Sequence, residues 1–131
     1  MSDAASFPIL LVDDEEEILF TTAVMLRSCG FTSVTTESDS RRVMDILARQ
    51  EVALIILDLY MPHLPGYDLL REIAANHPQI PVIVVTALAS RAERTFGLHV
   101  AKVDDYITKP FTPAELRRSV ANVLATEEAP V

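Results

Sequence analysis

Five polar residues that could do chemistry each follow an apolar run of this sequence. They are two adjacent carboxylates, a third carboxylate, a hydroxyl and an ammonium group: Asp13, Asp14, Asp58, Thr86 and Lys109. Two like charges about 4 Å apart repel by about 4 kcal/mol at an effective dielectric constant of about 20, so three clustered carboxylates require a cation. Ligands that are all oxygen favour Mg²⁺, for which Mn²⁺ can substitute.

The same set of side chains suits phosphoryl transfer. An aspartate such as Asp58 can attack phosphorus. A metal ion, the ammonium of Lys109 and the hydroxyl of Thr86 would stabilise charge on the transferring group. Taken singly, each residue has an ordinary explanation as a turn, a helix cap, a strand former or a surface charge. The prediction of a site therefore rests on the position of all five at strand ends.

Short apolar runs alternate five times with stretches of helical spacing. The apolar runs predict strands at residues 8–12, 31–36, 52–57, 81–86 and 102–108. The helical stretches cover residues 16–29, 38–50, 67–76, 90–97 and 112–125. Such alternation predicts an α/β fold, with a parallel sheet and helices on both faces. Ligands of these sheets bind beyond the carboxyl ends of the strands, where the five polar residues lie.

Cap residues mark the ends of several predicted helices. Gly30 follows the first helix, as glycine commonly does at helix C-termini. Ser90 with Glu93, and Thr112 with Glu115, have the spacing of capping boxes, so a helix is expected to begin at each.

Length, charge and composition exclude several classes of protein. A chain of 131 residues fits one domain, and a net charge of −8 argues against direct nucleic-acid binding. The single cysteine, Cys29, excludes an internal disulfide and a cysteine zinc site. Three glycines leave no Gly-rich loop for a nucleotide. The sequence starts without a basic signal-peptide segment, and no apolar stretch approaches about 18 residues, so we expect a soluble cytoplasmic protein without membrane contact.

Four motifs, in order, give the sequence a close resemblance to the response-regulator receiver family. They are Ile-Leu-Leu-Val-Asp-Asp-Glu at residues 9–15, Leu-Asp-Leu-Tyr-Met-Pro at 57–62 with Gly66, Val-Val-Thr-Ala at 84–87, and Asp-Asp-Tyr-Ile-Thr-Lys-Pro-Phe at 104–111. The resemblance runs from about residue 7 to residue 124. It implies a flavodoxin-like (βα)5 fold with strand order 2-1-3-4-5.

The resemblance also implies roles for the acidic residues. Asp58 corresponds to the phosphoacceptor of the family. Asp13 and Asp14 correspond to the acidic pair that binds Mg²⁺, directly or through water. The backbone carbonyl of Tyr60 corresponds to a further protein ligand of the metal. We therefore expect Asp13, Asp14, Asp58 and the Tyr60 carbonyl to form the metal site.

Four residues in or just after the last two predicted strands receive assignments in the same way. Thr86 and Lys109 correspond to the residues that bind the phosphoryl oxygens. Tyr106 corresponds to the aromatic switch residue that turns inward when Thr86 moves. The resemblance also implies a cis peptide bond between Lys109 and Pro110, whereas X–Pro bonds as a class are cis in only about 5–6% of cases.

The family resemblance further implies a signalling partner and a switching surface. The phosphoryl donor would be a sensor histidine kinase or a phosphotransfer protein. Phosphorylation would change the surface of helix 4, strand 5 and helix 5, and would favour a homodimer. Residues 1–125 would form the receiver domain, and residues 126–131 a tail or the start of a linker to an output domain. Such a domain is not an enzyme for other substrates, because it catalyses only its own phosphorylation and dephosphorylation.

Two other functions are consistent with parts of the pattern. Phosphatases with an aspartate nucleophile use similar chemistry but carry Asp-x-Asp after the first strand, whereas here the acids are adjacent and the nucleophile candidate follows the third strand. A degenerate receiver could act only as a docking module, but all five site residues are present. One departure from the family is Lys102-Val103, where many receivers have Gly-Ala, and it concerns the signalling surface.

Overall fold

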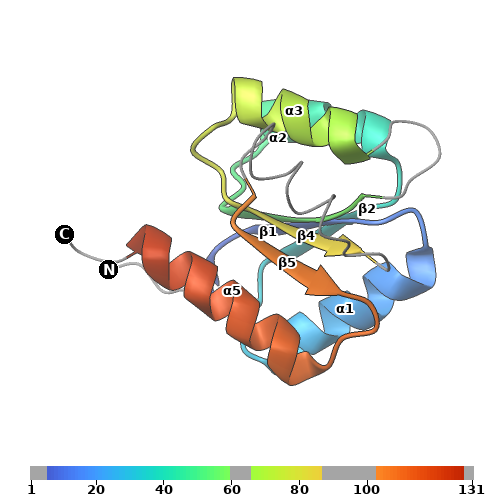
Figure 1. The fold of residues 1–131 in the computed structure, drawn as a ribbon, viewed down its shortest axis with the longest axis vertical. Coiled ribbons are helices and arrows are strands. Elements are labelled where there is room, and N and C mark those ends of the chain that lie inside the picture. Colours follow the sequence, from blue (N-terminus) through green and yellow to red (C-terminus); the bar gives the residue numbers. More distant parts are fainter. Residues whose placement is uncertain (1–5, 60–65, 87–102, 129–131) are drawn as a thin grey trace.

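A five-stranded parallel sheet forms the centre of the protein (Figure 1). The computed structural model describes residues 6–59, 66–86 and 103–128. Its strands are β1 (Ile9–Val12), β2 (Val34–Glu37), β3 (Leu54–Asp58), β4 (Val82–Thr86) and β5 (Asp105–Thr108). Their order is β2-β1-β3-β4-β5, and every neighbouring pair is parallel. The predicted α/β class, flavodoxin-like fold and strand order are confirmed.

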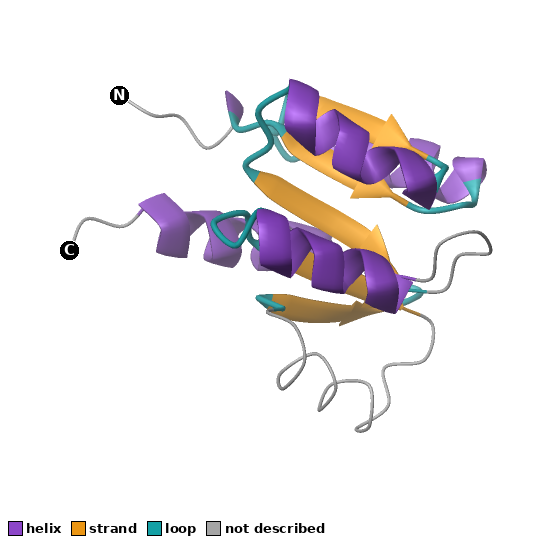
Figure 2. Cartoon of the chain, turned by 90° about the horizontal axis from the view of Figure 1, so that it is seen from above, coloured by secondary structure: helices purple, strands orange, loops and turns teal. Residues whose placement is uncertain are grey.

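Helices cover both faces of the sheet. The described helices are α1 (Glu16–Ser28), the 3₁₀ turn η2 (Ser40–Arg42), α2 (Val43–Arg49), α3 (Gly66–Asn76) and α5 (Pro113–Glu128). In Figure 1, α2 and α3 lie above the strands, while α1 and α5 lie below them. Figure 2 shows the same layers from above, with helices in front of and behind the sheet. None of the helices in the described ranges combines the length and apolarity that a membrane crossing requires.

Burial explains why the inner strands are continuously apolar. Every residue of β1, β3 and β4 is buried, because side chains on both faces of these strands meet helices. One apolar cluster joins the sheet to α2 and α3, and a second joins it to α1 and α5. The edge strands β2 and β5 are only partly buried, which explains their more polar sequences. The site residues that follow β1 and end β3 therefore emerge from the fully buried centre of the sheet.

The predicted second strand begins three residues too early. Residues 31–36 were expected, whereas β2 starts at Val34. Phe31 is buried in the α1–α5 cluster, and its N–H donates a hydrogen bond of 3.0 Å to the Leu26 carbonyl. Gly30 has a φ of +100°, the left-handed conformation that glycine adopts at helix ends. Phe31 thus closes helix α1 instead of starting a strand.

Other boundaries also differ from the sequence prediction. The fifth strand starts at Asp105, not at residue 102. The helix expected from residue 38 starts as the 3₁₀ turn η2, because the Asp39 side chain accepts a hydrogen bond from the Arg41 N–H at 3.0 Å. Helix α5 continues to Glu128, three residues beyond its expected end at residue 125. The assignment of residues 126–131 to a tail or linker stays a prediction.

One of the two predicted capping boxes lies within the described residues and is confirmed. The Glu115 N–H donates to the Thr112 hydroxyl at 3.1 Å, and the Thr112 N–H donates to the Glu115 carboxylate at 2.9 Å. The latter bond lowers the pKa of Glu115, because it stabilises the charged carboxylate. The box at Ser90 and the helix expected at residues 90–97 lie outside the described residues.

Candidate functional site

Three carboxylates meet at the carboxyl edge of the sheet. Asp58 is the last residue of β3, and Asp13 and Asp14 directly follow β1, its neighbour in the sheet. One oxygen atom from each of the three lies within 4.8 Å of the others. Asp13 and Asp58 are each only 5% exposed, whereas Asp14 is exposed. Parallel pairing of β1 with β3 therefore brings together residues that are 45 positions apart, as the sequence predicts.

Lys109 neutralises part of this negative charge. It follows β5 directly, and its Nζ lies 2.8 Å from an Asp13 oxygen and 3.3 Å from an Asp58 oxygen. Burial acts to lower the pKa of Lys109, but its hydrogen bond and charge interaction with Asp13, and the charge of Asp58, outweigh burial and raise it. The lysine is therefore a permanent cation that bridges two carboxylates. The peptide bond from Lys109 to Pro110 is cis in the structure.

The environment of the site changes the pKa of Asp58. Burial raises its pKa, the charge of Asp13 adds to the rise, and Lys109 opposes it, with a net increase from 3.8 to about 6. A carboxyl group with a pKa of about 6 is costly to ionise, because burial and a neighbouring carboxylate disfavour its charged form. One ammonium group is thus too little to balance three carboxylates.

Thr86 and Tyr106 occupy neighbouring strands beside the acidic cluster. Thr86 is the last residue of β4, is completely buried, and accepts a hydrogen bond of 2.9 Å from the Lys109 N–H through its carbonyl. It pairs in register with Thr108, and Val84 pairs with Tyr106 two residues earlier. Tyr106 is half-buried and packs against the cluster of α2 and α3, near Tyr67. Burial and the neighbouring Tyr106 both raise the pKa of Tyr67.

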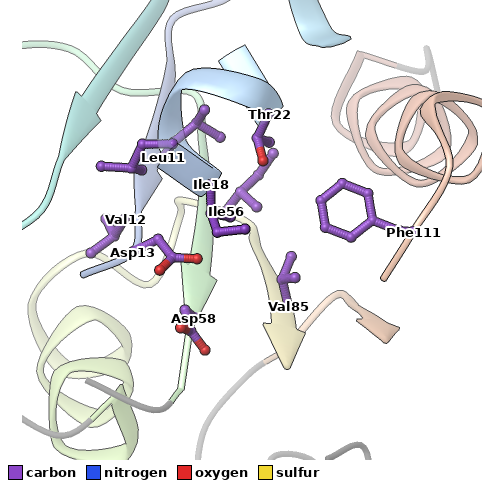
Figure 3. Close-up of a pocket in the computed structure, with 10 residues that line it drawn as sticks. Leu11, Val12, Asp13, Ile18, Thr22, Ile56, Asp58, Val85 and Phe111 are labelled. Atoms are coloured by element: carbon purple, nitrogen blue, oxygen red, sulfur yellow. The ribbon is translucent and has the colours of Figure 1, made fainter. Parts of the chain in front are cut away.

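A pocket extends from the carboxylates beneath helix α1. Asp13 and Asp58 lie at one end of it, and apolar side chains line the rest (Figure 3). Phe111, from the segment after β5, faces the pocket from the side opposite β1. Thr22 of α1 also lines it, although Thr22 is buried in the helix interface. Neither Thr22 nor Phe111 lies directly after a strand, so the rule of strand ends does not predict them as site residues.

The donor set fits a small divalent cation. Three carboxylates with oxygen atoms so close together, and a single ammonium group, leave about two negative charges to be balanced. Oxygen ligands of this kind suit Mg²⁺, which is usually held by few carboxylates and keeps positions for water and phosphate oxygens. Tyr60, whose carbonyl was expected as a further ligand, lies outside the described residues.

Comparison with known proteins agrees with the fold and with the acidic cluster. Residues 9–121 match the response regulator receiver domain family over most of the chain. The protein belongs to this family. It is therefore a receiver domain, a signalling module of two-component systems, and the predicted family is confirmed.

The match to one curated relative covers most of this chain but only half of the relative. The transcriptional regulatory protein CreB of Escherichia coli (strain K12) is 35% identical over 116 residues, which cover 88% of this receiver domain and 50% of CreB. The chain spans about half the length of the curated relatives it matches.

Solved receiver domains have the same architecture. A CheY-like response regulator receiver domain protein from Methanospirillum hungatei JF-1 superposes with a TM-score of 0.86 at 28% identity, covering 94% of this chain and 97% of that one. The receiver domain of the sensor histidine kinase PA1611 from Pseudomonas aeruginosa PAO1 has a TM-score of 0.79 at 34% identity, covering 89% and 96%. In that protein a magnesium ion is coordinated in the active site cleft.

Proposed function

We propose that Asp58 of this receiver domain accepts a phosphoryl group from a phosphohistidine of a sensor histidine kinase or a phosphotransfer protein in the cytoplasm. The observation that carries the proposal is the position of Asp58. It ends the central strand β3, it is buried, and it shares one ammonium group with a second carboxylate. Among the three acidic residues, Asp58 alone ends a strand rather than following one, and burial raises its pKa to about 6.

Asp13, Asp14 and Asp58 would hold Mg²⁺ together, with the Tyr60 carbonyl as a further ligand and Mn²⁺ as a substitute. The support is the distance between their oxygens and the magnesium ion described for the PA1611 receiver domain. When bound, the ion would neutralise the carboxylates and polarise the phosphoryl oxygens.

Phosphorylation would then proceed by a single displacement at phosphorus. An Asp58 carboxylate oxygen forms a bond to phosphorus while the phosphorus–nitrogen bond of the donor breaks and the imidazole leaves with the electron pair. Lys109, already in contact with Asp58, would bind a phosphoryl oxygen and stabilise the developing charge. Hydrolysis would remove the phosphoryl group again: water attacks phosphorus, the aspartyl oxygen–phosphorus bond breaks, and inorganic phosphate leaves.

Incubation with acetyl phosphate and Mg²⁺, followed by intact-mass analysis, tests the acceptor directly. We expect one phosphoryl group on the parent protein and none on Asp58→Asn, whose side chain has nearly the same shape. Asp104→Asn is the matched control, because it removes an aspartate charge elsewhere in the sheet, and it should be labelled like the parent. Full labelling of Asp58→Asn would refute the assignment.

The signal would pass from Thr86 to Tyr106. A phosphoryl group on Asp58 offers oxygen acceptors to the Thr86 hydroxyl, and Tyr106, two strand positions from the Thr108 that pairs with Thr86, would fill the space that Thr86 leaves. This would change the face formed by strand β5, helix α5 and the helix expected at residues 90–97.

We propose that this face forms a homodimer when Asp58 is phosphorylated. Light scattering with and without beryllofluoride, a mimic of the phosphoryl group, measures the change in mass. A mass that beryllofluoride leaves unchanged at high protein concentration would refute the dimer while leaving phosphorylation of Asp58 intact.

A further inference from the structure

Helix α1 exposes two large apolar side chains that the fold does not use. Phe20 is 70% exposed and Val24 is 46% exposed, and they are the large hydrophobic residues that stay exposed in the described part of the chain. The buried face of the helix is formed instead by Leu19, Thr22, Ala23 and Leu26. Because Phe20 and Val24 are four residues apart, they lie on one face of the helix. This apolar pair is therefore available for contact with another molecule.

Two charged residues extend this pair into a row. Glu17 lies three positions before Phe20, and Arg27 lies three positions after Val24. Both are exposed, and neither makes an ion pair with any residue in the described ranges. The spacing of three, four and three residues is that of a seam between two packed helices. We call the row Glu17, Phe20, Val24 and Arg27 the α1 seam.

The α1 seam is complementary to itself in one orientation only. If two copies pack with α1 antiparallel and the two-fold axis near position 22, Phe20 of one copy opposes Val24 of the other. In the same register Glu17 opposes Arg27 at both ends of the seam. Parallel packing would instead bring together two glutamates and two arginines, which repel. A surface with this property is what a two-fold symmetric dimer requires.

The geometry points to a second copy of this chain as the occupant of the α1 seam, in a two-fold dimer with antiparallel α1 helices. This dimer is independent of phosphorylation and uses a different face from β5 and α5. A groove between α1 and β2 adjoins the seam. Its lining is mixed: Leu19, Phe20 and Ala23 are apolar, and the other lining residues are Glu16, Arg27, Thr36, Glu37 and Ser38. In Figure 1, α1 is an outer element of the lower layer, so a second copy can approach it.

The charge of the protein limits the strength of the association. Each copy carries a net charge of −8, so the copies repel at low salt, and only the paired ends of the seam offset this. One pair of helices also buries less than the roughly 1,200 Å² of a standard interface. We therefore expect a weak dimer with a Kd on the order of 0.1 mM, strengthened by moderate salt.

Sedimentation of the unphosphorylated protein between about 0.01 and 1 mM, without a phosphoryl mimic, tests the α1 seam. The parent should shift from monomer to dimer across this range, and Phe20→Gln should stay monomeric. Arg27→Glu should also stay monomeric, because it places glutamates opposite each other. The exchange Glu17→Arg with Arg27→Glu should restore the dimer, because it reverses both pairs at once. Arg118→Glu, on exposed helix α5, is the matched control for the charge change and should behave like the parent.

Each outcome decides the proposal. A parent that stays monomeric at 1 mM would overturn the second copy as the occupant. Dimers of Arg27→Glu as strong as those of the parent would overturn the antiparallel seam. Thermal unfolding of every variant shows whether it is folded, and Val24→Gln provides a second apolar disruption that does not depend on the aromatic ring.

Discussion

Two pairs of adjacent aspartates flank strands at opposite edges of the same sheet, and they behave differently. Asp13 and Asp14 follow β1 at the carboxyl edge, while Asp104 and Asp105 lie at the start of β5, at the amino edge. The Asp104 carboxylate accepts a hydrogen bond of 2.8 Å from the Val82 N–H, and the Asp104 N–H donates one of 2.8 Å to the Val82 carbonyl. At the amino edge, backbone donors satisfy the negative charge.

In the described part of the chain, the carboxyl edge gathers three carboxylates and one ammonium group. Two of these carboxylates, those of Asp13 and Asp58, share the ammonium of Lys109, and the Glu15 N–H also donates to Asp13 at 3.0 Å. At the amino edge, a side chain provides a donor for the second aspartate: the Ser119 hydroxyl donates a hydrogen bond to Asp105 at 2.5 Å. The comparison teaches that an aspartate pair alone does not mark a site. An excess of negative charge over available donors does, because it creates a demand for a cation.

The largest expected difference between the two edges concerns the free energy of unfolding without metal. A pKa of Asp58 raised from 3.8 to about 6 corresponds to at most about 3 kcal/mol, and to less where water reaches the carboxylates. Because the folded protein binds this proton more tightly than the unfolded chain, the stabilisation is complete below pH about 4 and is lost as the pH rises through about 6. Asp58→Asn should therefore be more stable than the parent at pH 8, and equally stable near pH 4.

Urea unfolding in EDTA between pH 4 and 8 measures this difference. The matched variant is Asp104→Asn, which should be no more stable than the parent at any pH. If Asp58→Asn loses stability at pH 8 relative to the parent, the carboxyl edge does not carry excess negative charge.

Binding of Mg²⁺ should affect the carboxyl edge alone. A ligand at 100 times its Kd stabilises the folded state by about 2.7 kcal/mol. The parent and Asp104→Asn should both gain this amount at saturating Mg²⁺, whereas Asp13→Asn should gain much less, because it removes a ligand and a charge. Thermal unfolding with and without Mg²⁺ gives the shift, and an unchanged melting temperature of the parent would exclude the metal site.

The smallest expected effect is a loss of stability when a hydrogen bond at the amino edge is removed. Asp104→Ala leaves the N–H of the buried Val82 without its side-chain acceptor, and we expect a decrease of about 1–2 kcal/mol in the free energy of unfolding. Phosphorylation by acetyl phosphate should remain, and so should the stabilisation by Mg²⁺. A variant that unfolds normally but has lost the metal effect would show that the two edges are coupled.

Sequence patterns were sufficient to predict the architecture, because the inner strands are buried on both faces. Runs such as residues 52–57 have to be apolar there, so their position along the chain is visible without a structure. The positions of Asp13, Asp58 and Lys109 followed from the rule that parallel strands end at one edge, and the structure brings these three together. Helix ends could be predicted where the sequence contains a capping residue, as at Gly30 and Thr112.

Distances and exposure could not be predicted in this way. The sequence does not show that Lys109 lies closer to Asp13 than to Asp58, because that depends on the path of the chain after β5. An apolar residue before a polar strand, such as Phe31, fits a strand or a helix closure equally well until its hydrogen bond is known. Helical spacing predicted a helix over residues 16–29, but the exposure of Phe20 became clear only when the packing of α1 was known.

The order in which the chain is synthesised gives the short strand β5 a particular importance. Asp58 precedes Lys109 by 51 residues, which a ribosome adds in about 3–10 s at about 5–20 residues per second. Once residue 86 has been added, β1, β3 and β4 have all been synthesised while Lys109 has not, and the outer edge of β4 has no strand to pair with. Completion of β5 ends both conditions at once, because the same segment fills the sheet edge and carries the lysine. Until the fifth strand has been synthesised, the three carboxylates at the carboxyl edge therefore lack the ammonium group of Lys109.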